Sequence, residues 1–181
     1  MILSDSELVE MLREPRTRRE GFAVLVKQYS DKLYWKVRRI VLSHEDANDV
    51  LQNVFIKVWS NLQNFQGKSS LSTWLYRIAV NESLDFLRKQ KLADRVSADE
   101  DVSVASRLMS DEYFDGDEVQ ARLQEAVARL PEVQRTVFNL KYFEEMKYSE
   151  MSQILNTSEG ALKASYHLAV KKITEYLHLF D

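Results

Sequence analysis

Apolar residues recur at spacings of three and four along most of this chain, which predicts amphipathic helices. In the first half, the pattern covers three long segments, Phe22 to Val41, Ala47 to Leu62 and about Leu71 to Leu92. A polar break at 64–70 separates the second segment from the third. Three pairs of Ser or Thr with an acidic residue three positions later predict helix starts at Ser4, Thr17 and Ser43. We therefore expect a small helical bundle.

The second half divides into shorter helices. We predict four helices: Glu118 to Leu130, Pro131 to about Tyr142, Ser149 to Leu155, and a last helix that is capped by Ser158 and ends at about Leu177. Proline suits the first turn of a helix, where its missing N–H is not needed, and serine is a common N-cap. A short helix, a tight turn at 156–157 and a longer helix form a helix-turn-helix, although other packed three-helix units share this pattern.

The composition favours an all-α protein. Only 4 Gly and 2 Pro occur in 181 residues, too few for the turns of a sandwich or a barrel, or for a glycine-rich phosphate loop. Without Cys, the chain has no thiol nucleophile, disulfide or cysteine-based zinc site. The longest apolar run, 22–26, is far too short to span a membrane, and the first residues lack the pattern of a signal peptide. We expect a cytoplasmic protein without membrane insertion.

Charge is distributed unevenly and indicates two domains. Residues 1–95 carry 16 Lys and Arg against 12 Asp and Glu, residues 96–120 carry 1 against 8, and residues 121–181 carry 8 against 8. A short acidic, serine-rich stretch cannot bury enough apolar surface to fold alone. We predict two small helical domains, 1–95 and 119–181, joined by an acidic linker at 96–118. The linker is either a solvated connector or a segment whose carboxylates mimic phosphates and mask a basic face.

The third predicted helix has a polar, largely basic side. On a helical wheel these residues fall within about 80° of one another: Arg77, Asn81, Arg88, Lys91 and Arg95. The opposite side carries core candidates: Trp74, Ile78, Ala79 and Phe86. The preceding loop offers an aromatic ring, an amide and hydroxyls that suit an unstacked base: Phe65, Gln66, Lys68, Ser69 and Ser70. A solvated basic face is the alternative, and the amide of Asn81 among the cations favours nucleic acid.

The second predicted helix has a polar face of carboxylates and amides: Asp46, Asp49, Gln52 and Asn53. This face is either solubilising, with acidic residues favoured at a helix N-terminus, or a docking surface for a basic helical partner. A metal site is a weaker reading, because His44 is the only nearby imidazole.

Catalysis has no evident site in the sequence. His167 and His178 are separated by roughly 16 Å of helical rise, so they cannot share a metal. No Walker, zincin or nucleophile-elbow motif occurs. We therefore expect neither an enzyme nor a metal or other cofactor.

Three segments carry a resemblance to a known family. They are DANDVLQNVF at 46–55, NFQGKSS followed by LSTWLYRIAVN at 64–81, and RLPEVQRTVFNLKYFEEMKYSEMSQILNTSEGALKASYHLAVKKI at 129–173. With their order and spacing intact, the chain resembles a bacterial RNA polymerase sigma factor of the extracytoplasmic-function (ECF) group. The resemblance implies a two-domain initiation factor, with region 2 in the first domain and region 4 in the second.

The resemblance also implies roles for particular residues. Docking on the β′ subunit of core polymerase would fall to Asp46, Asp49, Gln52, Asn53 and Phe55. Capture of a flipped base of the −10 promoter element and contact with its strand would fall to Phe65, Gln66, Gly67, Lys68, Ser69, Ser70, Arg77, Asn81, Arg88 and Lys91. Reading of the −35 element would fall to Ser158, Glu159, Gly160, Lys163, Ala164, His167 and Lys171. The implied partners are the β′ and β subunits of core RNA polymerase, promoter DNA and an anti-sigma factor.

The last helix departs from the pattern of many relatives. Ala164, Ser165, Leu168 and Val170 stand where Arg or another polar residue is common, so contact of Arg with guanine is not available here. We expect region 4 to use phosphate contacts, the helix N-terminus at 158–160 and DNA shape. The alternative function is a stand-alone dimeric helix-turn-helix transcriptional regulator, which would need a ligand pocket or dimer face in the first domain. A helical nucleotide hydrolase is more distant.

Overall fold

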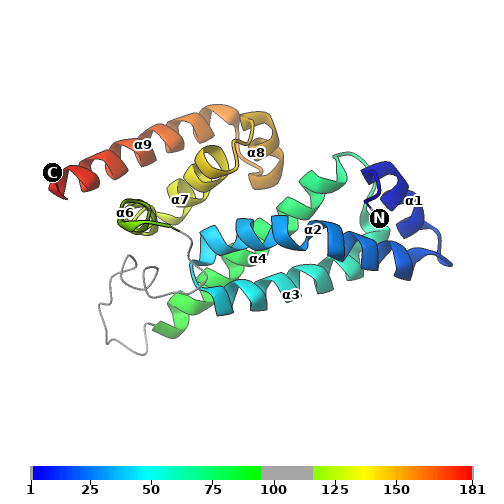
Figure 1. Ribbon diagram of the computed structural model, residues 1–181. Helices are drawn as coiled ribbons and strands as arrows, with labels where there is room; N and C mark the ends of the chain where they lie inside the picture. The colour runs from blue at the N-terminus through cyan, green and yellow to red at the C-terminus, as the bar shows by residue number, and fades with distance from the viewer. Residues whose placement is uncertain (1, 95–115, 181) are drawn as a thin grey trace. The chain divides into compact units, whose positions relative to one another are not determined.

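The computed structural model describes the backbone of residues 2–94 and 116–180 and the side chains of 2–90 and 116–179. Every regular element in these ranges is helical, which confirms the predicted all-α class (Figure 1). The chain divides into two compact units, residues 1–90 and 91–181. Most of the predicted acidic linker, 96–118, lies outside the described residues, as does Arg95.

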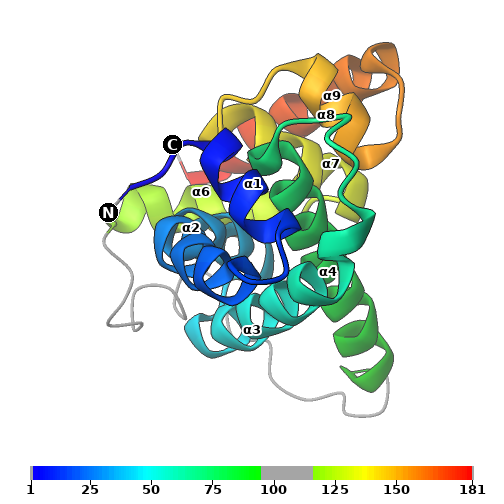
Figure 2. The ribbon, with the colours of Figure 1, turned by 90° about the vertical axis from the view of Figure 1, so that its right-hand side faces the viewer.

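The first unit is built from α1 (Asp5–Arg13), α2 (Arg18–Val41), α3 (His44–Asn61) and most of α4 (Leu71–Asp94), with a short 3-10 turn η1 (Leu62–Asn64) after α3. The three long helices confirm the segments that the apolar spacing predicts. Helices α2 and α3 lie side by side, joined by a turn at 42–43 (Figure 1). Figure 2 shows α1 beside the chain that leads from α3 to α4, and contacts between α1 and η1 support this view.

Local capping decides where several helices begin. Ser4 and Glu7 form the predicted capping box: the Ser4 N–H donates to the Glu7 carboxylate at 2.8 Å, and the Glu7 N–H donates to Ser4 Oγ at 3.4 Å. Ser43 Oγ accepts the Asp46 N–H at 3.3 Å, as predicted. The helix start predicted at Thr17 is confirmed, since α2 begins at Arg18, but no capping box forms there, because the Thr17 hydroxyl donates instead to the Met11 carbonyl at 2.9 Å.

Buried aliphatic side chains fill the first unit, and they include Leu8, Leu25, Leu33, Val37, Val50, Val54, Val58, Leu71 and Leu75. The predicted core face of α4 needs correction. Ala79 is buried, but Trp74, Ile78 and Phe86 are only partly buried, while Leu75 and Leu87 are buried. The buried stripe is therefore rotated around the helix, and Trp74 instead contacts Phe65 of the preceding loop, with ring centroids 5.1 Å apart.

Two charged side chains attach α4 to its neighbours. The buried Lys36 of α2 places its ammonium over the Tyr76 ring, 4.1 Å from the centroid. Lys57 of α3 forms an ion pair with Glu82. The first contact is buried and so is little screened by solvent, whereas Lys57 is half exposed and contributes less. Together they fix the rotation of α4, which sets the side chains that it presents to solvent.

The second unit contains α6 (Glu118–Ala128), α7 (Glu132–Phe138), a π-helical turn η2 (Asn139–Phe143), α8 (Tyr148–Leu155), α9 (Glu159–Leu177) and a 3-10 turn η3 (His178–Phe180). Pro131 is the N-cap of α7 and not a residue of its first turn, because its ψ of 146° is extended. Asn156 adopts a left-handed conformation, φ 50°, that ends α8. Ser158 Oγ accepts the Ala161 N–H at 3.2 Å and so caps α9, as predicted.

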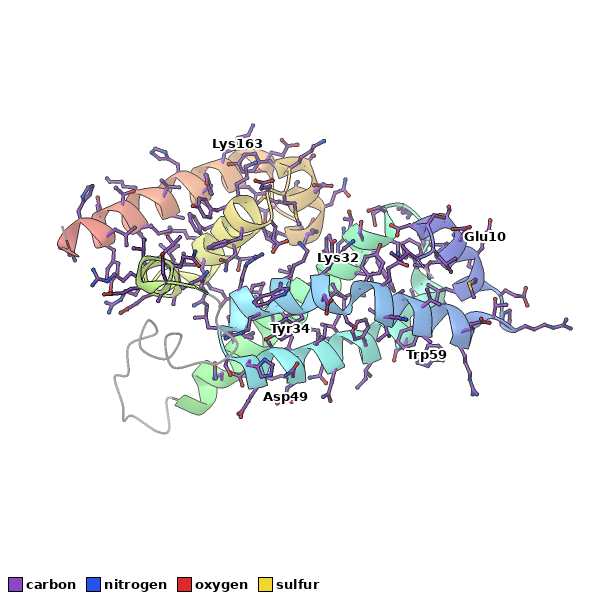
Figure 3. The ribbon with its side chains drawn as sticks, in the orientation of Figure 1. Glu10, Lys32, Tyr34, Asp49, Trp59 and Lys163 are labelled. Atoms are coloured by element: carbon purple, nitrogen blue, oxygen red, sulfur yellow. The ribbon has the colours of Figure 1, made fainter. Side chains whose placement is uncertain are left out.

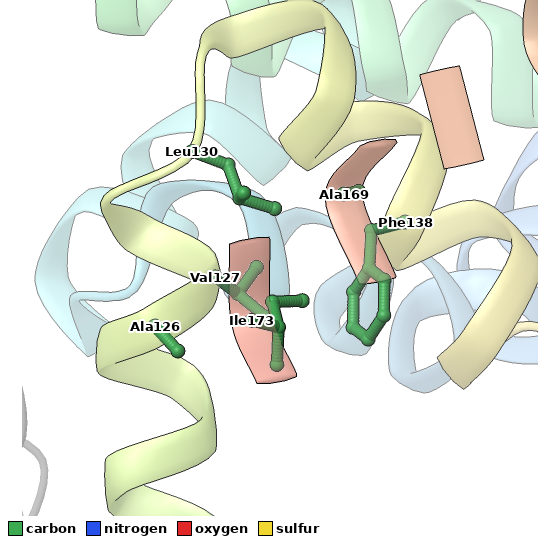
Figure 4. Close-up of a cluster of buried hydrophobic side chains, with 6 residues drawn as sticks. All are labelled: Ala126, Val127, Leu130, Phe138, Ala169 and Ile173. Carbon is green, nitrogen blue, oxygen red and sulfur yellow. The ribbon is translucent and has the colours of Figure 1, made fainter. Parts of the chain in front are cut away.

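A cluster of apolar side chains holds α9 against α6 and α7. Figure 4 shows its members: Ala126, Val127, Leu130, Phe138, Ala169 and Ile173. Phe138 also stacks on Tyr142 and Tyr166, with centroid separations of 5.0 and 5.9 Å. The buried Arg135 donates from Nη1 to the Ala128 carbonyl at 3.2 Å, which joins α7 to the end of α6. Helix α9 is thereby held rigidly along one side and exposed along the other.

Candidate protein and nucleic-acid interfaces

The polar face predicted on α3 is present and largely open to solvent. Asp49, Gln52 and Asn53 are exposed, and Figure 3 shows Asp49 projecting outward from α3. Asp46 is partly buried. Phe55 is also partly buried, because its ring packs edge-on against Phe22 with centroids 6.4 Å apart. Three of these five side chains are therefore free to meet a partner, and the other two reach it in part.

Two exposed apolar residues on α3 were not predicted from the sequence. Ile56 is 63% exposed and Trp59 is 42% exposed, although the apolar spacing assigns Trp59 to the core side. Ile56 follows Gln52 by one turn and Asn53 by three residues, so it lies within the polar face. Trp59 is supported from one side by Phe22, at a centroid distance of 5.0 Å. An apolar centre with a polar rim is the usual anatomy of a protein interface.

Asp46 is the residue of this face whose surroundings disfavour its charged form. Burial raises the pKa of its carboxyl, the negative charges of Asp49 and Glu45 raise it further, and hydrogen bonds to Ser43 and Gln90 act in the opposite direction. The contact with Gln90 also places Asp46 against α4. Asp46 therefore belongs partly to the packing of α3 on α4 and only partly to the exposed face.

Asp46→Asn is expected to raise the thermal stability of the first unit at neutral pH, because it removes a carboxylate held where burial disfavours charge. Since the folded-state pKa is raised, wild-type stability increases as pH falls through that pKa, and the advantage of the variant should shrink there. Thermal unfolding followed by circular dichroism between about pH 4 and 7 measures both effects. Asp31→Asn, which removes an exposed aspartate charge from α2, is the control. A variant less stable than wild type at pH 7 would contradict the assignment.

The loop at 65–70 combines an aromatic contact with a turn that requires glycine. Phe65 and Trp74 are both partly buried and face each other at 5.1 Å with an interplanar angle of 48°. Gly67 has φ +69°, a backbone conformation that residues with a side chain rarely adopt. A Cβ at this position would lie 3.5 Å from Arg13 Nη2. Gln66 and Lys68 are exposed, whereas Ser69 is partly buried. The loop thus offers an aromatic pair beside hydrogen-bonding groups, and the guanidinium of Arg13 adds a cation that was not predicted from the sequence.

Ser70 has a local structural role in addition to any contact with a partner. Its Oγ accepts the Thr73 N–H at 3.1 Å and donates to Thr73 Oγ1 at 2.9 Å, so it caps the start of α4. This cap fixes the end of the loop relative to the helix, because two hydrogen bonds hold one hydroxyl in place. Thr73 itself is buried.

The basic side of α4 is less uniform than the wheel predicts. Asn81 and Arg88 are exposed, and Arg88 pairs with Asp85 at 3.1 Å. Arg77 is partly buried. Lys91 lies in α4, but its side chain is outside the described residues, so the stripe is visible only from Arg77 to Arg88. Asn81 stands at the exposed centre of this part.

All the residues predicted on the last helix lie on its solvent side or at its start. Exposed positions include Ser158, Glu159, Gly160, Lys163, Ala164, His167 and Lys171. The Ser158 hydroxyl is engaged in the cap described above. Lys171 approaches the Glu175 carboxylate at 3.9 Å, an exposed pair of the kind that contributes little stability.

A basic cluster around Tyr148 was not foreseen from the sequence. The ammonium groups of Lys141 and Lys163 lie 4.9 and 5.5 Å from the centroid of the Tyr148 ring. Lys141 also donates to the Met146 carbonyl at 3.3 Å, which fixes its position. Lys163 projects from α9 to the outside (Figure 3). The two cations therefore sit beside the start of α8, where backbone N–H groups also favour an anion.

Metal-binding clusters and membrane-spanning helices are both absent from the part of the chain that the structure describes. Within residues 2–94 and 116–180, no group of three or more acidic or His side chains is placed to hold a metal ion. No helix in the same ranges is long and apolar enough to cross a membrane.

Comparisons with known proteins agree with this arrangement. The family model for Sigma-70 region 2 matches residues 25–93, and that for Sigma-70 region 4 matches residues 120–173. The chain is 33% identical over 157 residues to the ECF RNA polymerase sigma factor SigW of Bacillus subtilis, covering 82% of this chain and 84% of that protein. It is 30% identical over 189 residues to the RNA polymerase sigma-H factor of Pseudomonas aeruginosa, covering 96% and 93%. Its fold is similar to that of the sigma factor RpoE from Bartonella quintana, solved in complex with the anti-sigma factor NepR (TM-score 0.69, 22% identity, covering 88% and 98%).

Proposed function

Because this chain belongs to the ECF group of RNA polymerase sigma factors, we propose that its three exposed surfaces divide the work of promoter recognition. The face of α3 binds core polymerase, the loop at 65–70 with α4 binds the −10 element, and α9 binds the −35 element. A sigma factor confers promoter specificity on core RNA polymerase and assists melting, so this protein acts by binding and not by covalent catalysis. It works in the cytoplasm, with the polymerase.

The observation that carries this proposal is the presence of both sigma regions in one chain, in order. A stand-alone dimeric regulator would need only the helix-turn-helix of the second unit. It would not need the exposed polar face of α3 or the aromatic loop before α4. Run-off transcription with core polymerase, on an intact and on a premelted promoter, tests the proposal. Failure to support transcription on either template would contradict it.

The α3 face is suited to a helical partner with basic residues. Asp49 supplies an exposed negative charge, Gln52 and Asn53 supply hydrogen bonds, and Ile56 supplies an apolar centre. Electrostatic complementarity increases the association rate and selects the partner, whereas burial of the apolar centre slows dissociation. We assign this face to the β′ subunit. The β subunit is expected to contact other parts of the protein.

The loop and α4 suit a single strand with one base unstacked. Aromatic side chains such as Phe65 and Trp74 provide stacking worth roughly 1–3 kcal/mol per base, which offsets part of the unstacking cost in the duplex. Asn81 can donate and accept hydrogen bonds at a base edge. Arg88 neutralises phosphate charge as the strand passes along α4.

The second unit suits a duplex read mainly through its backbone. Lys141 and Lys163, both held against the ring of Tyr148, are placed to bind phosphates together with the start of α8. The start of α9, capped by Ser158, offers backbone N–H groups to the DNA. These contacts orient α9 in the groove without specifying a sequence.

An anti-sigma factor is the proposed regulator of this protein. The similar fold of RpoE from Bartonella quintana has been solved in complex with one. Such a partner would compete with core polymerase for exposed surface. Titration of a purified anti-sigma candidate against the complex of this protein with core polymerase would detect that competition.

Asn81→Ala and Arg88→Ala are expected to have different defects. Asn81→Ala should reduce transcription from an intact promoter and change preference at one or two −10 positions, by roughly 1–3 kcal/mol, because it removes a base contact. Arg88→Ala should weaken binding about equally for all sequences and reduce its salt dependence, because it removes a phosphate contact. Single-base promoter substitutions and a salt series separate these effects. A sequence-independent defect for Asn81→Ala, relieved at low salt, would show that Asn81 only positions the backbone.

A further inference from the structure

The outward side of α9 carries cations but no arginine. Its exposed residues recur at helical spacing: Gly160, Lys163, Ala164, His167, Leu168 and Lys171. Arginine is the side chain that most often reads guanine, through two hydrogen bonds in the major groove, and α9 contains none along Glu159–Leu177. Lysine ammonium groups bind phosphates as point charges and carry little sequence information. Base discrimination by α9 therefore has to come from other side chains.

Leu168 is an apolar side chain within this charged surface. It is 46% exposed, and it follows the exposed Ala164 by one helical turn, so the two are neighbours on the helix surface. Lys171 and Lys172 come three and four residues later and are also exposed. A single exposed leucine is ordinary in proteins. What distinguishes Leu168 is its place among cations that would hold it close to a phosphate backbone.

We propose that Leu168, with Ala164 beside it, contacts the C5 methyl group of a thymine in the −35 element. The inference rests on the proposed role of α9 in reading that element. Thymine alone among the bases presents a methyl group in the major groove. Contact between this methyl and the leucine side chain removes apolar surface of both from water. Selectivity for an A·T pair then arises without a hydrogen bond to the base.

The test uses holoenzyme made from the full chain and core polymerase, on a promoter selected from a library with a randomised upstream element. Each thymine of the selected element is replaced in turn by deoxyuridine, which removes only the C5 methyl. Wild-type holoenzyme should bind at least one substituted promoter roughly three- to tenfold more weakly, the scale of one buried methyl group. Leu168→Ala should bind the thymine and uracil forms of that promoter equally.

Val170→Ala is the matched control. Val170 is an apolar residue on the same helix, 38% exposed, and it lies about 160° around the helix from Leu168. This variant should keep the wild-type uracil penalty. Leu168→Arg tests the assignment by gain of function: a repeated selection should favour a G·C pair at the position where wild type is sensitive to uracil, because Arg can hydrogen bond twice to guanine. An unchanged preference would count against the contact.

Other results would overturn the inference in distinguishable ways. A uracil penalty that persists in Leu168→Ala, or no penalty at any thymine, would refute the methyl contact and leave the sigma function intact. Weaker binding of Leu168→Ala to core polymerase, with an unchanged uracil penalty, would assign Leu168 to a protein contact. A selection that returns no upstream preference would instead contradict the proposed role of α9.

Discussion

Asp49→Arg is expected to weaken binding to core polymerase by roughly 30- to 150-fold, because it places a positive charge against a basic partner at a cost of about 2–3 kcal/mol. Asp49 is exposed on α3, so the fold should be unaffected. Titration of the protein with core polymerase measures the affinity, and circular dichroism checks the helical content. Transcription should decrease on every promoter, since binding to core polymerase precedes DNA recognition.

Asp31→Arg is the matched control for this charge reversal. Asp31 is also an exposed aspartate on a long helix of the first unit, but it lies on α2 and outside the proposed face. It should bind core polymerase like wild type. If both variants bind equally well, or if Asp49→Arg unfolds, the α3 face is not the docking surface.

Phe138→Ala is expected to destabilise the second unit by about 3–5 kcal/mol, because it removes the ring at the centre of the apolar cluster of that unit. The stacking partners Tyr142 and Tyr166 would lose their common contact. The variant should therefore lose its response to the upstream element. It should still bind core polymerase through the first unit.

Tryptophan fluorescence can follow the unfolding of the first unit separately from that of the second. Its three tryptophans, Trp35, Trp59 and Trp74, all lie in the first unit. In Phe138→Ala, helix loss by circular dichroism should begin at a lower temperature, while the tryptophan fluorescence transition stays where it is in wild type. Leu33→Ala, in the core of the first unit, should shift the fluorescence transition instead. If both signals shift together in Phe138→Ala, the two units fold as one and the proposed domain division fails.

The sequence predicts the helices of this protein well because helix signals are local. Apolar spacing depends on a period of 3.6 residues, and it located α2, α3, α4 and α9 to within a few residues. The caps at Ser4, Ser43 and Ser158 are likewise made with a backbone N–H three residues away. Thr17 precedes α2 as predicted, but its capping hydrogen bond is absent, because its hydroxyl donates to a carbonyl of the preceding helix, α1.

The exposure of the candidate site residues could also be predicted where it depends on local sequence, and not where it depends on neighbouring helices. Exposure of Asp49, Gln52, Lys163 and His167 could be predicted because polar residues opposite an apolar stripe face solvent. Their roles came from resemblance to a family and not from periodicity. The partial burial of Arg77 could not be predicted, because a helical wheel shows direction around one helix and not the reach of its neighbours.

Tertiary packing alone decided the remaining features of the interfaces. The sequence prediction placed Trp74 in the core, although a wheel puts it only about 60° from Arg77; the buried stripe of α4 passes through Leu75, and Trp74 contacts Phe65. Trp59 belongs to the apolar pattern of α3 but stands exposed beside Phe22. Lys141, Tyr148 and Lys163 come from three segments and meet only when α8 and α9 pack. The sequence by itself determined the helices and their polar faces, because those depend on residues a few positions apart. Only the tertiary structure decided which aromatic rings and cations converge, because that depends on how each helix is rotated against its neighbours.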